Sequence, residues 1–116
     1  MASSFRELEV WRKSIALAKD IYKITNRMLS NERFGLTSPM RRAAVSIPAN
    51  IAEGNARKSR KDYIHFLTVA RGPLAELETL LIIAQELGMV SEIQSAWESI
   101  GQTTRMLHAL SNRLPE

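Results

Sequence analysis

The stretch SRKDYIHFLTVARGPLAELETLLIIAQELG, residues 59–88, decides the fold because it carries the longest helical pattern in the chain. Ser59 and Asp62 form a capping signal at its start, and Gly88 follows at its end. The apolar residues between them recur at steps of three and four, as on one face of a helix. They are Tyr63, Phe66, Ala70, Leu74, Leu77, Leu81, Ala84 and Leu87. The pattern predicts one helix over residues 60–87.

The preceding segment predicts a second helix over residues 38–53. Ser38 followed by Pro39 is a standard N-cap and first-turn pair, and Gly54 is expected to end the helix in the left-handed conformation. The buried stripe is expected to consist of Met40, Ala44, Ile47 and Ile51.

Two prolines fall inside these predicted helices. Pro48 lacks a backbone N–H and clashes with the preceding turn, so we expect a kink near residues 44–47. Pro73 follows Gly72, and glycine relieves part of the steric conflict with a following proline. A bend in the longer helix is therefore expected rather than a break.

Residues 5–29 and 92–113 predict the first and the last helix. Each start carries a capping box, Ser4 with Glu7 and Ser91 with Gln94. Residues 31–37 and 55–60 lack helical periodicity and are expected to be connections. The first helix is expected to bury Leu8, Trp11, Ile15, Ala18, Tyr22 and Thr25, and the last one Ile93, Trp97, Ile100, Leu107 and Leu110.

Four helices joined by short connections predict a single all-α domain over residues 1–116, an up-down-up-down antiparallel four-helix bundle. A chain of 116 residues can bury a sufficient core without disulfides, and it contains no cysteine. Its apolar runs are too short to span a bilayer, and no export signal is recognisable at the start. We expect a cytoplasmic protein that does not contact membranes.

The net charge of +4 is distributed unevenly. Residues 1–30 carry a net charge of +3 and residues 31–61 carry +5, whereas residues 62–116 carry −4. A basic half favours a polyanionic partner. A basic half beside an acidic half also suits head-to-tail association of identical subunits. The charge pattern alone leaves both hypotheses open.

No catalytic constellation is legible in the sequence. The two histidines lack a nearby nucleophile, and the five glycines form no phosphate-binding loop. Asp62 and His65 have the spacing of a di-iron motif, but such a site needs the motif twice. We expect no catalytic residue, metal, cofactor or small-molecule substrate. A metal enzyme using Asp62 and His65 is the alternative, and it predicts stoichiometric metal in the purified protein.

The densest charge feature contains Arg57, Lys58, Arg60 and Lys61 around Ser59. It lies where a helix begins, and the unpaired N–H groups and the dipole of a helix start favour anions such as phosphate. Arg41 and Arg42 are expected to add to this nucleic-acid-binding surface. The few aromatic residues fall mostly on predicted core stripes, so we expect phosphate contacts without base stacking. The competing interpretation is a solvated loop or a partner for acidic helices.

Several segments resemble the small bacterial four-helix bundle proteins associated with 23S ribosomal RNA intervening sequences. The most specific is RRAAVSIPANIAEG at residues 41–54, and the others are FRELEVW at 5–11, FGL at 34–36 and AELE at 75–78. The resemblance implies a bundle that assembles into a ring-shaped homo-oligomer, a pentamer. It also implies kinship with the nucleic-acid-binding accessory proteins of diversity-generating retroelements, and it does not imply an enzyme. Pro73 departs from the family pattern, which puts the straightness of its helix in doubt.

The same family segment gives Asn50, Glu53 and Gly54 a possible structural role, and we expect a polar contact between helices or subunits there. Our leading hypothesis is a non-enzymatic homo-oligomer that binds nucleic acid, RNA rather than DNA. The alternative is a protein scaffold whose basic and acidic halves drive ring assembly without nucleic acid.

Overall fold

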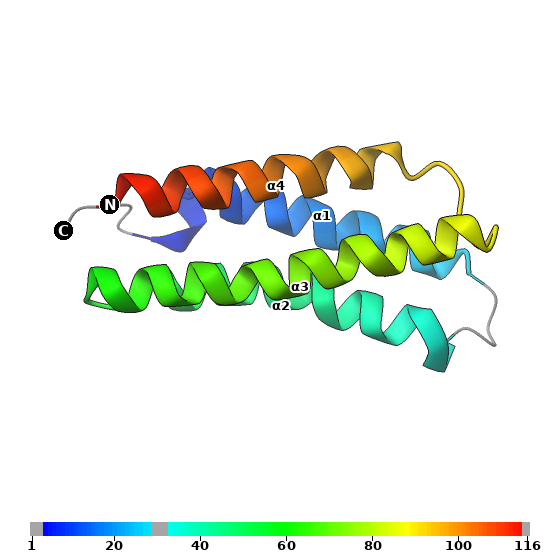
Figure 1. Cartoon of the computed structure of the whole chain (residues 1–116), viewed down its shortest axis with the longest axis horizontal. Coiled ribbons are helices and arrows are strands. Elements are labelled where there is room, and N and C mark those ends of the chain that lie inside the picture. The colour runs from blue at the N-terminus through cyan, green and yellow to red at the C-terminus, as the bar shows by residue number, and fades with distance from the viewer. Residues whose placement is uncertain (1–3, 29–32, 115–116) are drawn as a thin grey trace.

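Four α-helices pack side by side in the computed structural model, which describes residues 4–28 and 33–114 (Figure 1). They are α1 (Glu9–Asn26), α2 (Ser38–Asn55), α3 (Arg60–Glu86) and α4 (Gln94–Arg113). The described ranges contain no strand, and the bundle measures 47 × 23 × 20 Å. The predicted all-α class and four helices are therefore confirmed.

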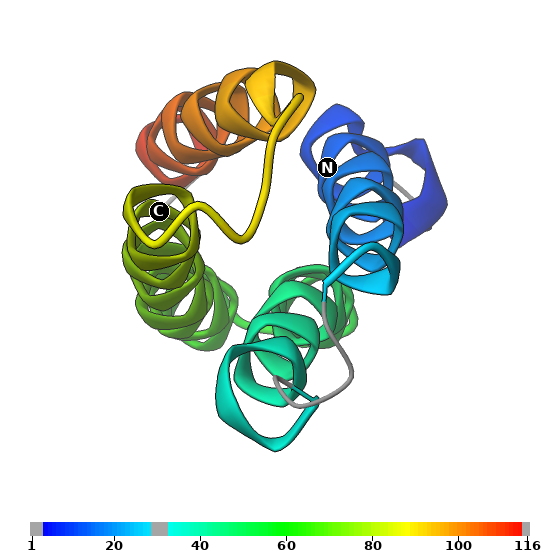
Figure 2. The same ribbon diagram turned by 90° about the vertical axis from the view of Figure 1, so that its right-hand side faces the viewer.

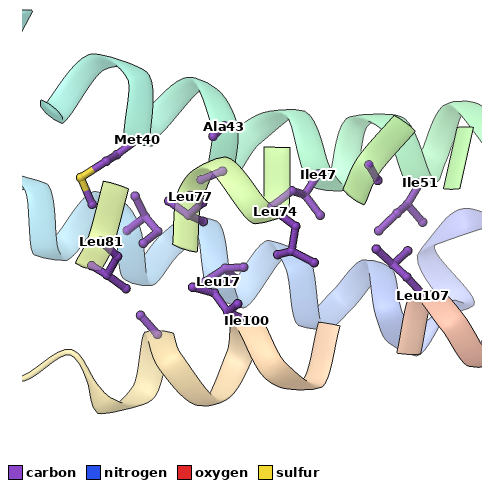
Figure 3. Close-up of a cluster of buried hydrophobic side chains, with 14 of the residues drawn as sticks. Leu17, Met40, Ala43, Ile47, Ile51, Leu74, Leu77, Leu81, Ile100 and Leu107 are labelled. Carbon is purple, nitrogen blue, oxygen red and sulfur yellow. The ribbon is translucent and has the colours of Figure 1, made fainter. Parts of the chain in front are cut away.

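Each helix packs against two neighbours. α1 and α3 both contact α2 and α4, so the four helices surround one core (Figure 2). Leu17, Ile47, Leu74 and Ile100, one from each helix, point toward a common centre (Figure 3). The connection between α2 and α3 lies at the same end of the bundle as the start of α1 and the end of α4 (Figure 1).

The predicted stripe of α2 is confirmed, because all four of its residues are fully buried. In α3 the stripe is confirmed at six positions, whereas Phe66 is half-buried and Leu87 is 62% exposed. Leu67, which the prediction missed, is fully buried. α3 is one continuous helix through Pro73. It ends as predicted at Gly88, where a φ of 72° allows Met89 N–H to bond back to Ala84.

The predicted stripe of α1 is confirmed at Thr25, but from Trp11 to Tyr22 it is wrong by one residue. The buried residues of this helix are Val10, Ser14, Leu17, Ile21, Ile24 and Thr25. A shift of one residue turns a helix by about 100°. The sequence interpretation passed over Ser14 as polar, but its hydroxyl donates to the carbonyl of Trp11 (2.7 Å) and is satisfied in the core. Tyr22, which was expected inside, is consequently 42% exposed.

Three of the four predicted helix starts need correction. Ser4 caps only a 3-10 helix, Phe5–Glu7, and α1 begins after an extended Leu8. Ser38 is already helical, because a π-helical turn, Arg33–Thr37, runs into α2 without a side-chain cap. α4 begins at Gln94 with no side-chain cap from Ser91. A capping signature therefore caps an α-helix only where its serine occupies the N-cap position and has an extended backbone. Position 29, the predicted end of the first helix, lies outside the described residues.

Gly54 does not end α2 in the left-handed conformation. The helix continues through it to Asn55, and Gly88 is the glycine with positive φ among the described residues. A Cβ atom at Gly54 would lie 2.9 Å from Phe66 Cβ and 3.2 Å from Tyr63 O. Gly54 is therefore needed because α2 and α3 approach closely there. Among the described helices, none is both long and apolar enough to cross a membrane.

Candidate nucleic-acid interface

The basic segment, residues 57–61, sits on a rigid support formed by the end of α2 and the start of α3. Gly54 lies against Tyr63 and Phe66, and the lack of a side chain at Gly54 lets α2 and α3 approach closely. Asn55 Nδ2 donates to Tyr63 Oη at 3.1 Å. Burial of Tyr63 raises the pKa of its phenol, and the hydrogen bond from Asn55 opposes that effect. The connection between the helices is thus fixed by packing and by a hydrogen bond.

Arg57 is held by two neighbours at the end of α2. Its guanidinium forms an ion pair with Glu53, four residues earlier. It also lies over the ring of Phe66, 4.7 Å from the ring centroid. Part of the charge of Arg57 is therefore neutralised within the protein, although the side chain remains 44% exposed.

Ser59 caps α3 as predicted, with its hydroxyl oxygen accepting from Asp62 N–H at 3.1 Å. The adjacent Arg60 is half-buried, and its Nε donates to the carbonyl of Leu114 at 3.1 Å. This bond ties the start of α3 to the end of α4. Arg60 thus links two helices in addition to carrying charge.

Lys58 and Lys61 are the exposed cations that remain in the basic segment. Within the described ranges, neither is in an ion pair with a carboxylate. Both flank the capped start of α3, where the helix dipole adds positive potential. These two lysines are therefore the most accessible charges for an anionic ligand.

Three further exposed arginines belong to the same end of the bundle: Arg6, Arg12 and Arg113. They lie in the first 3-10 helix, at the start of α1 and at the end of α4, which meet at this end (Figure 1). Arg12 Nη1 donates to the carbonyl of Arg6 at 3.0 Å, joining the two segments. The sequence interpretation did not group these residues with the basic segment. The predicted antiparallel order of the helices could have shown that these arginines and the basic segment share one end of the bundle.

Arg41 and Arg42 lie near the opposite end of α2. Arg41 is fourteen residues before Asn55, about 21 Å at 1.5 Å per residue. Its Nε donates to Thr25 Oγ1 (2.8 Å) and its Nη2 to Asn26 Oδ1 (2.7 Å), which bind it to α1. The structure therefore divides the six predicted residues into two groups.

The expected polar contact at Asn50 is not one between helices. Asn50 Nδ2 donates to the carbonyl and the hydroxyl of Ser46 in the same helix, at 2.8 and 3.0 Å. Glu53 pairs with Arg57 just beyond the end of α2, and Gly54 makes an apolar contact with α3. Next to this segment, Asn55 makes a polar contact from the end of α2 to Tyr63 of α3, which the sequence interpretation missed.

The possible metal pair gains no support from the geometry. His65 is exposed and packs edge-on against Phe66, with ring centroids 5.3 Å apart. No group of three or more histidine or acidic side chains in the described part of the chain could hold a metal ion.

Comparison with known proteins places the chain in a family. No curated protein matches it. The model of one family, the 23S rRNA-intervening sequence proteins, matches residues 6–109. This match covers α1, α2, α3, the basic segment and α4 as far as residue 109. The chain belongs to the 23S rRNA-intervening sequence protein family.

Proposed function

We propose that this protein binds nucleic acid through its basic segment, without catalysis and as a homo-oligomer. The observation that carries the proposal is the exposure of Lys58 and Lys61 beside the capped start of α3. The family description names 23S rRNA, and we propose RNA rather than DNA as the ligand on that association.

The arrangement of the basic segment suits backbone phosphates. Arg57 and Arg60 are fixed by contacts within the protein, so the segment keeps its shape when it is free. Lys58 and Lys61 can each place an ammonium group on a phosphate, which neutralises charge and releases counterions. Contacts of this kind fix the position of a strand but do not read its sequence.

A salt titration tests the proposal. Affinity for a ribosomal RNA fragment should fall steeply with salt concentration in the wild-type protein. In Lys58→Ala/Lys61→Ala the slope of log affinity against log salt should become shallower by about 1.4, because each lost contact to single-stranded RNA removes about 0.7. Lys19→Ala/Lys23→Ala removes the same charge from the exposed face of α1 and should leave the slope unchanged. Equal slopes for the two double variants would place the surface elsewhere.

Homo-oligomerisation is supported by the outer face of α3. Val69, Ile83 and Leu87 lie within about 40° of one another around this helix and are 39–62% exposed. Ile83 and Leu87 are one turn apart, and exposed apolar residues that cluster on a surface commonly mark protein interfaces. We propose that α3 of an up-down-up-down bundle contacts a second copy here, in the pentameric ring that the resemblance implies.

Light scattering tests this assembly. Ile83→Glu/Leu87→Glu should lower the mass in solution, whereas Ile82→Glu, on another side of α3, should not.

Replacing the four cations of the basic segment by glutamate separates the two candidate functions. A lower mass after that change, with no RNA binding by the wild type, would favour a scaffold assembled by its basic and acidic halves. An unchanged mass would reject that scaffold.

A further inference from the structure

A hollow on the described surface lies between α1 and α2, away from the basic segment. Its volume is about 680 Å³, within the range of roughly 300–1,000 Å³ that is typical of ligand sites. We name it the α1–α2 groove. Its lining residues are Tyr22, Thr37, Ser38, Arg41, Arg42, Val45 and Ser46.

The groove combines apolar surface with positive charge. Tyr22 and Val45 are 42% and 48% exposed and supply the apolar part. Among the described residues, no carboxylate lines the groove. A smaller hollow of about 260 Å³ between α1 and α4 differs, because Glu9 lies there beside Lys13 and Arg105. The α1–α2 groove therefore fits an anionic partner that also presents a flat or apolar surface.

Contacts within the protein hold the two arginines of the groove in place. The guanidinium of Arg41 bonds to α1 and lies over the ring of Tyr22, 4.6 Å from its centroid. Arg42 Nη1 donates to Ser38 Oγ at 2.8 Å, and no described carboxylate forms an ion pair with Arg42. Its remaining N–H groups are available to a phosphate.

We propose that the α1–α2 groove binds one unpaired nucleotide of a single strand, with the base against Tyr22 and Val45 and the phosphate on Arg42. Aromatic side chains and guanidinium planes commonly stack with unpaired bases, and arginine commonly binds the adjoining phosphate. The inference rests on the proposed function, since it adds a base-binding site to a molecule that binds the strand through Lys58 and Lys61.

Affinity for a short single strand of poly-uridine tests the groove. Val45→Glu places a carboxylate in the groove and should lower affinity about tenfold, in the range expected when one stacked base is lost. Ile82→Glu adds the same charge at a residue of similar exposure, 40%, and should have no such effect. Tyr22→Ala should resemble Val45→Glu, whereas Tyr22→Phe keeps the ring and should retain wild-type affinity. An abasic strand of equal charge should bind more weakly and should not respond to Tyr22→Ala.

Photocrosslinking with 4-thiouridine locates the base directly. A strand containing this base should crosslink to peptides of the groove, and free 4-thiouridine monophosphate shows whether a single nucleotide suffices. Crosslinks elsewhere, or equal affinities of Val45→Glu and Ile82→Glu, would overturn the inference while salt-dependent binding through the lysines stands. Absence of salt-dependent strand binding would instead reject the proposed function. Crosslinking of free 4-thiouridine monophosphate would then show separately whether the groove binds a nucleotide.

Discussion

The two ends of α2 carry basic residues in different surroundings. Near the start of the helix, Arg41 is bound to Thr25 and Asn26 of α1 beside an apolar groove. Beyond its end, Lys58 in the connection and Lys61 in the first turn of α3 are exposed to solvent on either side of the Ser59 cap. Basic residues that the sequence interpretation assigned to one surface thus lie beside a groove at one end and in solvent at the other.

The difference indicates that packing decides what a basic residue can do. A guanidinium held by hydrogen bonds keeps one position and suits a ligand of defined shape. An exposed ammonium on a flexible stem follows a phosphate wherever the strand places it. The positions of Lys58 and Lys61 depend on the junction of α2 and α3, which Gly54, Ser59 and Tyr63 help to hold together.

The largest effect on stability is expected from Gly54→Ala. The added Cβ would lie 2.9 Å from Phe66 Cβ, so the backbones of α2 and α3 must separate. We expect the free energy of unfolding to fall by about 1–3 kcal/mol, as in other overpacked sites, when measured by urea unfolding.

Gly101→Ala is the matched control for that variant. A Cβ at Gly101 would meet only the far end of the flexible Arg105 side chain, 3.3 Å from Nη1, and alanine favours the helix more than glycine does. This variant should keep or raise the stability by up to about 1 kcal/mol. A loss equal to that of Gly54→Ala would show that the close approach of α2 and α3 is not what requires glycine.

A smaller effect is expected from Ser59→Ala, which removes the cap of α3. The loss should be about 1 kcal/mol in urea unfolding, the usual cost of an N-cap serine. Ser91→Ala changes the corresponding position of a similar capping signature, but Ser91 caps no helix here, so its stability should stay near that of the wild type. Equal losses would contradict the assignment of caps.

The smallest effect depends on pH and concerns Tyr63. Burial raises the pKa of its phenol in the folded protein above the ordinary value of 10.0, so above that pH the unfolded chain loses the proton first. The contribution of the buried neutral phenol to the free energy of unfolding is fully present below pH 10.0 and is lost as the pH rises through the raised pKa. The stability of the wild type relative to Tyr63→Phe should therefore fall above pH 10.0 in urea titrations at several pH values. A constant difference would contradict the burial of the phenol.

The sequence predicted the second helix and its buried stripe well, because Met40, Ala44, Ile47 and Ile51 are apolar at regular helical spacing. It placed the face of the first helix one residue away, because the buried Ser14 interrupts the apolar pattern. Polarity alone does not reveal whether a serine satisfies its hydroxyl within its own helix.

The candidate site was predictable only in part. The basic segment and the Ser59 cap followed from local sequence, since both depend on neighbouring residues. The contacts of Arg41 with α1 depend on the register between two helices, which no local pattern encodes. The ring of Tyr22 is exposed because α1 is rotated relative to the predicted orientation. The sequence interpretation placed this ring in the core and for that reason expected no base stacking.

Lysine footprinting with RNA bound is the most direct test of whether RNA binds at Lys58 and Lys61. The chain contains five lysines, at positions 13, 19, 23, 58 and 61, and each can be acetylated with and without RNA and compared by mass spectrometry. We predict that RNA protects Lys58 and Lys61 and leaves Lys19 and Lys23 reactive. Equal protection of all five lysines, or protection confined to those of α1, would contradict a binding surface at the connection between α2 and α3.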